Sequence, residues 1–193
     1  MNIVEATLPK GLFGEKADKK TIAQAVRVYL SNQRTALAKT KTRGEVNKTT
    51  AKMYKQKGTG KARHGAYSAP IFVGGGVAFG PTGEQNYDLK MSDKIRRIAL
   101  LGALFEKAKA KQVKILSADK ATGKTSEAAK LVSGKRTLLI ISAKQEKVAR
   151  AFRNIKNVTI TTGANLNTYT VMVSRELIFT EEALKEAAKT YAK

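Results

Sequence analysis

The stretch Thr137-Leu138-Leu139-Ile140-Ile141 is almost entirely apolar, and it decides the fold class. A short continuous apolar run is typical of a strand that is buried on both faces, as strands are in parallel sheets. A helical segment follows it at about residues 145–152. The same alternation continues on either side, with strands predicted at 113–116, 158–161 and 170–173 and a short helix at 125–131. We therefore predict an α/β fold with a mainly parallel sheet that is flanked by helices.

Four further elements are predicted outside this alternation. Apolar residues recur at helical spacing over 22–30, which indicates a helix that begins near residue 20. A second helix at 93–108 is apolar nearly all round its centre, so we expect that centre to be buried. Thr180 is a candidate N-cap, followed by two acids, for a closing helix that extends to Ala192. A short edge strand is predicted at 2–6.

The segment from Lys39 to Pro81 differs from the rest of the chain in composition. It contains no Leu, Ile or Phe before Pro70, so its first part cannot bury a core. Eight of the 15 glycines lie between residues 58 and 83. A loop of this length inside a compact domain is normally either functional or disordered. We predict one single globular domain, residues 1–193, into which a long extended basic loop, residues 39–91, is inserted.

The charge of the chain favours a polyanionic partner, because 37 basic residues against 15 acidic ones give a net charge of +22. Aromatic rings lie among the loop cations and offer stacking surfaces for unpaired bases. No DNA-recognition helix, zinc finger or zipper is visible, so folded RNA fits better than duplex DNA. A DNA-compacting or membrane-surface protein is the rival interpretation. The residues predicted to contact RNA are Lys39, Lys41, Arg43, Lys48, Lys52, Tyr54, Lys55, Lys57, Lys61, Arg63, His64, Tyr67, Lys90, Lys94, Arg96 and Arg97.

One pattern points to a nucleotide-binding enzyme instead. Gly123-Lys124-Thr125 follows a predicted strand and precedes a predicted helix, which is the context of a phosphate-binding loop. However, Ala118 stands where that motif needs glycine, and the next strand ends in Ser142 rather than in a metal-binding Asp. With one histidine, His64, and no Cys, the chain predicts no metal site, cofactor or catalytic triad. We expect no enzymatic activity and no small-molecule substrate.

The sequence also predicts where the protein resides. Its first residues lack the apolar core of a signal peptide. The longest apolar run of note, at 98–105, is too short to span a bilayer. We expect a cytoplasmic protein with no membrane partner.

Three motifs resemble one known family. The stretch Gln56-Lys57-Gly58-Thr59-Gly60-Lys61-Ala62-Arg63-His64-Gly65 resembles the loop signature of bacterial large-subunit ribosomal protein four, the uL-four family. The stretch from Pro70 to Pro81, with its three successive glycines, resembles the next part of that loop. Residues 94–100 resemble the helix after the loop, and the resemblance covers essentially the whole chain. The sequence departs from the common pattern at Tyr54, where a Trp is frequent, and at Val73, where an Arg is frequent.

The resemblance implies an α/β domain on the outer face of the large ribosomal subunit and a loop that reaches through rRNA to the peptide exit tunnel. It implies a primary rRNA-binding protein of early subunit assembly, with neighbouring large-subunit proteins and the nascent polypeptide as further partners. Lys61, Arg63 and His64 would bind the rRNA around the tip of the loop. Glycine lets a backbone approach another surface closely. The implied tip is Lys55, Gln56, Lys57, Gly58, Thr59 and Gly60, and the glycines expected to pack closely against RNA are Gly74, Gly75, Gly76 and Gly80.

Overall fold

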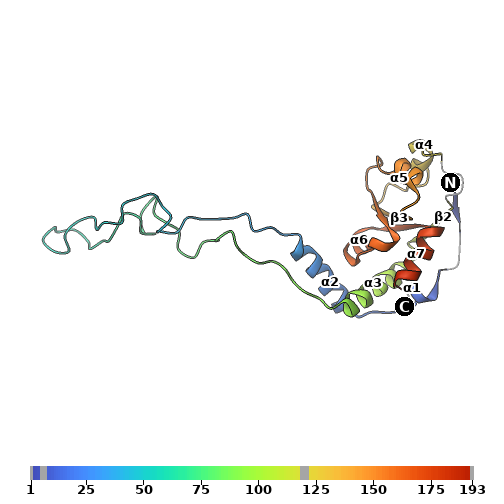
Figure 1. Cartoon of the computed structure of the whole chain (residues 1–193), viewed down its shortest axis with the longest axis horizontal. Coiled ribbons are helices and arrows are strands. Elements are labelled where there is room, and N and C mark those ends of the chain that lie inside the picture. Colours follow the sequence, from blue (N-terminus) through green and yellow to red (C-terminus); the bar gives the residue numbers. More distant parts are fainter. Residues whose placement is uncertain (1, 5–7, 118–121, 192–193) are drawn as a thin grey trace. The chain divides into compact units, whose positions relative to one another are not determined.

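The computed structural model describes residues 2–4, 8–117 and 122–191. The chain divides into two units, one formed by Met1–Leu30 with Leu89–Lys193 and the other by Ser31–Asp88. We call the first the globular unit and the second the arm. All strands among the described residues belong to the globular unit, whose sheet and covering helices are labelled in Figure 1.

The sheet of the globular unit has five strands in the order β1-β2-β5-β3-β4. β2 pairs with β5, β5 with β3 and β3 with β4, all in parallel, whereas β1 pairs with β2 in the antiparallel sense at one edge. The prediction of a mainly parallel sheet is therefore confirmed. The strands are β1 (Asn2–Val4), β2 (Val113–Ser117), β3 (Thr137–Ile141), β4 (Val158–Thr162) and β5 (Glu176–Thr180).

Helices cover both faces of this sheet. Neighbouring residues of a strand point to opposite sides, so each central strand contributes side chains to the core on either face. On β3, Leu138 and Ile140 join one core cluster, and Leu139 and Ile141 join the other. The first cluster lies under α1 (Lys10–Phe13), α2 (Lys19–Asn32), α3 (Asp93–Lys109), α6 (Thr168–Val173) and α7 (Glu181–Tyr191), and the second under α4 (Thr125–Ala129) and α5 (Glu146–Phe152).

The predicted helices at 20–33 and 93–108 are present as α2 and α3. Of the centre of α3 that was expected to be buried, 98–105, Ala99–Leu104 are buried, whereas Ile98 is 38% exposed and Phe105 is half-buried. There a Cβ on Gly102 would lie 2.2 Å from the Cβ of Ala17, so glycine permits this close packing. In α2 the buried residues lie at Ile22, Ala25 and Val28, while Leu30 is exposed. Within the described ranges, no helix has the length and apolar character needed to cross a bilayer.

The prediction of a strand at 170–173 is wrong. These residues form α6, which Asn167 caps by accepting a hydrogen bond from Thr170 N at 2.8 Å. The β-branched residues of this stretch favour a strand by propensity, but Val171 alone of 170–173 is fully buried, as on one face of a short helix. The strand instead follows this helix, at Glu176–Thr180, and all five of its residues are buried.

The predicted N-cap of the closing helix is confirmed. Ala183 N donates a hydrogen bond to Thr180 Oγ1 at 3.4 Å, and Glu181 and Glu182 occupy the first turn of α7. Both carboxylates are placed where the partial positive charge of a helix N-terminus stabilises them. Ala192, the predicted end of this helix, lies outside the described residues, as do residues 5 and 6 of the predicted edge strand.

Glu176 opens the central strand β5 and is nearly buried, with 8% of its surface exposed. Its carboxylate accepts a hydrogen bond from Ser133 Oγ at 2.9 Å and lies 3.3 Å from Lys114 Nζ and 3.6 Å from Lys135 Nζ. Burial raises the pKa of Glu176. The hydrogen bonds from Ser133 and Lys114 and the two lysine charges outweigh this effect, so the pKa lies below its ordinary value.

Because folding lowers the pKa of Glu176, the stability of the globular unit depends on pH in the acid range. A carboxylate whose pKa is lowered by folding contributes its full stability above the unfolded pKa, near 4.5, and loses it as pH falls through the folded pKa. Glu176→Gln should lower the free energy of unfolding at neutral pH by about 1.5–3 kcal/mol, the usual range for hydrogen bonds to charged groups. The variant should also lose less stability than the unmodified chain as the pH falls below 4.5. Urea unfolding across this range checks both effects, and an acid-side loss equal to that of the unmodified chain contradicts them.

Candidate nucleic-acid interface

The arm is a loop whose two limbs pair with each other. The base is held by Ser31 Oγ, which donates to Tyr87 O at 2.6 Å, and by Arg34, whose guanidinium lies 4.0 Å from the centre of the Tyr87 ring. Beyond the base, the limbs form an isolated antiparallel bridge and backbone hydrogen bonds, among them Thr40 N to Pro81 O (2.9 Å), Val77 N to Lys41 O (2.9 Å) and Met53 N to Gly65 O (3.1 Å).

Close packing between the limbs depends on glycine. A Cβ on Gly76 would lie 2.2 Å from the backbone nitrogen of Arg43, and one on Gly80 would lie 2.0 Å from Thr40 Oγ1. A Cβ on Gly75 would likewise lie 2.0 Å from a backbone oxygen of its own limb. The fourth glycine predicted to pack against RNA, Gly74, would place a Cβ 2.9 Å from Lys48 Nζ, so all four pack against the arm itself.

The predicted cations of the arm, from Lys39 to Arg63, are all exposed. Among the described residues of the arm, only Lys39 forms an ion pair, with Glu45 at 3.5 Å. The Glu45 carboxylate also accepts hydrogen bonds from Thr42 N at 2.9 Å and Thr42 Oγ1 at 3.0 Å. These bonds, the backbone one foremost, and the charge of Lys39 lower the pKa of Glu45. The other eight cations carry charges that no acid in the described arm pairs with.

His64 lies inside a cluster of aromatic rings. Its ring meets Phe72 edge-on at a centroid distance of 5.1 Å and Tyr54 at 6.5 Å, and Tyr67 lies against Phe72 at 5.8 Å. The Tyr54 hydroxyl donates to the carbonyl oxygen of Ala62. His64 and Tyr54 are thus half-buried and pack within the arm. Tyr67 remains 52% exposed, so part of its ring surface is accessible from solvent. Phe72, at the centre of the cluster, was not among the predicted site residues.

All six residues of the predicted tip, 55–60, are exposed. Gly58 and Gly60 have φ values of +83° and +64°, a left-handed conformation that favours glycine, and no atom lies within 4 Å of where their Cβ would be. Outside the tip, Gly74 also has a positive φ, +76°. At the tip the glycines therefore serve to turn the chain, and the amine of Lys52 donates to Gln56 beside the turn.

Sequence reasoning missed the three most exposed apolar side chains of the stretch 70–81. Phe79 and Val73 are as exposed as in an extended peptide, at 107% and 102%, and Ile71 is 70% exposed. Phe79 also has a φ of +56°, which is strained for a bulky residue. The interlimb hydrogen bonds at Val77 and Pro81, on either side of Phe79, hold this conformation. A signal existed in the sequence, since these residues stand between glycines with no apolar run in the arm to cover them.

The remaining predicted contacts, Lys90, Lys94, Arg96 and Arg97, belong to the globular unit. Arg97 Nε donates to Tyr191 O at 2.7 Å, and Arg96 pairs with Asp93 at 3.1 Å. Both arginines therefore have partners within the chain, while Lys90 and Lys94 are exposed.

The candidate nucleotide loop lacks a carboxylate at the end of the next strand. Gly123 has a φ of +81° and α4 begins at Thr125, but Ala118 lies outside the described residues. Ser142, which follows β3, is 1% exposed, and its hydroxyl donates to Glu186 of α7. In a phosphate-binding loop enzyme, a metal-binding Asp stands at the end of the next strand. In this chain that position is Ser142, which is buried and hydrogen-bonded to Glu186.

Comparison with known proteins identifies the family. Residues 6–190 match the sequence profile of the ribosomal protein L4/L1 family. The large ribosomal subunit protein uL4 of Pelotomaculum thermopropionicum is 34% identical over 97% of this chain and 93% of the relative. The uL4 proteins of Symbiobacterium thermophilum and Hyphomonas neptunium are 36% and 40% identical, over 93% and 91% of this chain and 89% and 85% of their own lengths. The chain therefore belongs to the ribosomal protein L4/L1 family, as a bacterial uL4 protein.

Proposed function

We propose that this chain is a non-catalytic structural protein of the large ribosomal subunit and that its arm binds rRNA. Membership of the uL4 family makes it a component of the large subunit in the bacterial cytoplasm. One observation carries the proposal for the arm, namely that eight of the nine cations at 39–63 are exposed without an acidic partner among the described residues of the arm. Such cations bind phosphates and release condensed counterions, which makes the affinity depend on salt.

The aromatic and apolar side chains of the arm supply a second mode of contact. RNA presents unpaired bases in loops and bulges, and these bases stack on exposed rings. Tyr67 and Phe79 are the exposed rings of the arm, and His64 supports Tyr67 indirectly through Phe72. The arm thus combines phosphate contacts with stacking surfaces, which suits folded RNA better than a duplex.

The tip of the arm is proposed to face the polypeptide exit tunnel, with the nascent chain and neighbouring ribosomal proteins as further partners. The exposure of all six residues at 55–60, together with two lysines and two left-handed glycines, supports a segment that turns back inside a narrow RNA-lined space. Photocrosslinkers at Lys57 and Arg63 in assembled subunits test this. Crosslinks from Lys57 to nascent peptide or tunnel rRNA are expected, and crosslinks to the chain's own globular unit alone oppose it.

Co-sedimentation with large subunits tests the function as a whole. The protein should travel with large subunits through high-salt washing and should bind early assembly intermediates, because a primary rRNA binder needs no other protein to dock. Binding only to mature subunits, or equal affinity for duplex DNA and anionic vesicles, is the outcome that opposes the proposal. A nucleotide-binding enzyme predicts saturable ATP binding that Lys124→Ala abolishes, and we expect no such binding.

Phe79 offers a direct optical test of stacking. The chain contains no Trp, so Phe79→Trp introduces a single indole, which can be excited selectively over Tyr, at an exposed position of the arm. Its emission should be quenched when a structured large-subunit rRNA fragment is added, because a stacked base quenches an indole, and Phe79→Ala should weaken binding by about 1–3 kcal/mol. Met172→Trp, at an exposed position of the globular unit, is the control and should change little. An equal response of both reporters contradicts a stacking role for Phe79.

A further inference from the structure

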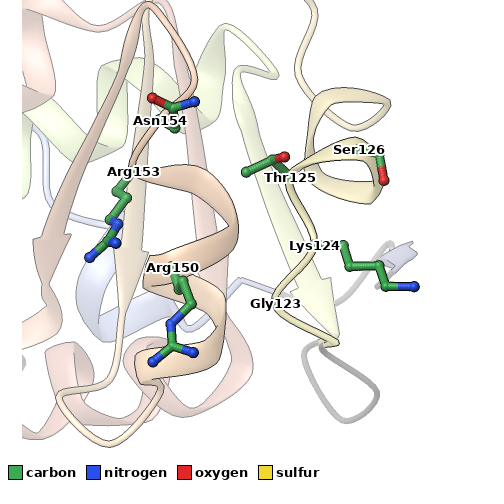
Figure 2. A pocket seen from close by; sticks show the side chains of 7 residues that line it. All are labelled: Gly123, Lys124, Thr125, Ser126, Arg150, Arg153 and Asn154. Atoms are coloured by element: carbon green, nitrogen blue, oxygen red, sulfur yellow. The ribbon is translucent and has the colours of Figure 1, made fainter.

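A cleft of about 810 Å³ opens in the globular unit beside α4 and the carboxyl end of α5. Figure 2 shows the side chains that line it, with the loop before α4 on one side and the last turn of α5 on the other. Among the described residues, the side chains that line the cleft are basic or neutral hydrogen-bonding groups, with no acid: Lys124, Thr125, Ser126, Arg150, Arg153 and Asn154.

The cations of the cleft have no ion-pair partner in the part of the chain that the structure describes. Lys124, Arg150 and Arg153 are exposed, and none of them takes part in an ion pair among the described residues. Residues 122–157, which include the lining of the cleft, contain nine Lys and Arg against two acids, Glu127 and Glu146, so this part of the chain is strongly basic as well. A positive surface with unpaired guanidinium groups matches phosphate, to which arginine binds by two parallel hydrogen bonds.

The directions of the side chains distinguish between two sources of phosphate. In Figure 2 the Arg150 and Arg153 side chains extend from the end of α5, whereas Lys124 points away from them on the far side of the loop. A nucleotide phosphate needs donors that converge on one point. Cations spread along a surface instead fit a chain of successive phosphates, with Thr125, Ser126 and Asn154 as neutral donors between them.

We propose that this cleft binds backbone phosphates of RNA and forms a second RNA-binding site, on the globular unit and apart from the arm. The inference rests on the proposed rRNA binding and adds residues that neither the loop signature nor the predicted contacts include. Arg150 and Arg153 are its main phosphate ligands, and Lys124 extends the site beyond the cleft. Both arginines also lie at the end of α5, where cations stabilise a helix, so stability has to be measured alongside binding.

The test is the salt dependence of binding of the full-length chain to a structured large-subunit rRNA fragment. Arg150→Gln/Arg153→Gln should make the slope of log affinity against log salt shallower by about 1.4–1.8, the value for two lost phosphate contacts. Lys185→Gln/Lys189→Gln on α7 removes the same charge from exposed positions on the other face of the sheet and should change the slope by much less. Equal changes for the two pairs would overturn the site.

A second measurement needs no substitution, so it holds even if the arginine variant folds poorly. On the unmodified protein, RNA should protect Lys124 from acetylation more strongly than Lys185, as read by mass spectrometry. Equal protection would overturn the cleft. Saturable ATP binding that is lost in Arg150→Gln/Arg153→Gln would overturn the assignment of RNA as the ligand in favour of a nucleotide. If arm variants change the salt slope and the cleft variant does not, the second site is wrong and the proposed function stands; if neither does, the proposed function fails.

Discussion

Replacing residues 42–76 by an Asn-Gly turn should leave the globular unit folded and remove most of the binding to rRNA. Lys41 O and Val77 N lie 2.9 Å apart in a hydrogen bond, so the two cut ends are already positioned for a tight turn. The replacement removes seven cations, each of which can meet one phosphate. The log–log salt slope should therefore become shallower by about 5 to 6. Filter binding across a salt series measures this change.

A matched variant separates charge from shape. Changing the same seven cations, Arg43, Lys48, Lys52, Lys55, Lys57, Lys61 and Arg63, to Gln keeps the arm and should produce a similar loss of slope. Both variants should unfold cooperatively at nearly the temperature of the unmodified chain. Loss of that cooperative transition in the replacement variant would show that the arm is part of the core, and an unchanged slope would reject it as the main binding element.

Phe179→Ala should destabilise the globular unit by about 3–5 kcal/mol, the usual cost of removing a buried Phe side chain. Phe179, the fourth residue of β5, is 0% exposed, and its ring meets Phe13 of α1 edge-on at 5.9 Å. Truncation leaves a cavity between the sheet and α1 that the surrounding helices cannot fill. Because a whole domain is stable by only about 5–15 kcal/mol, much of the protein should be close to unfolding. Urea unfolding gives the value.

The same substitution at Phe79 is the control. Its side chain is fully exposed, so Phe79→Ala should change the free energy of unfolding by no more than about 0.5 kcal/mol while weakening RNA binding. Phe179→Ala should do the reverse at temperatures where the chain is still folded. If both variants lose stability equally, the fully exposed placement of Phe79 is wrong.

The parts of the fold that were predictable from sequence are those where apolar pattern and local signals agree. β3 is a run of buried apolar residues and α3 has an apolar centre, and both were found. β5 was missed because it begins with Glu176, whose charge suits a buried position only once Ser133, Lys114 and Lys135 surround it. Residues 170–173 misled because β-branched residues favour strands, whereas the cap at Asn167 starts a helix.

The candidate site divides in the same way. The exposure of the cations of the arm could be predicted, since the stretch from Lys39 to Pro70 has no Leu, Ile or Phe with which to form a core. The placement of His64 beside Phe72 and the contact of Gly76 with Arg43 could not, because each depends on the register in which two distant limbs meet. The exposure of Phe79 follows from that register too, as the hydrogen bonds on either side of it fix its backbone.

The position of β5 in the sheet has a consequence for biosynthesis. β5 lies between β2 and β3, yet of the five strands it is translated last. Until residues 176–180 emerge, β2 and β3 have no common neighbour and their apolar faces stay unprotected. The cationic segment 31–88 is by then long outside the synthesising ribosome. A nascent copy of this protein therefore exposes its cationic segment before its globular unit can complete the sheet.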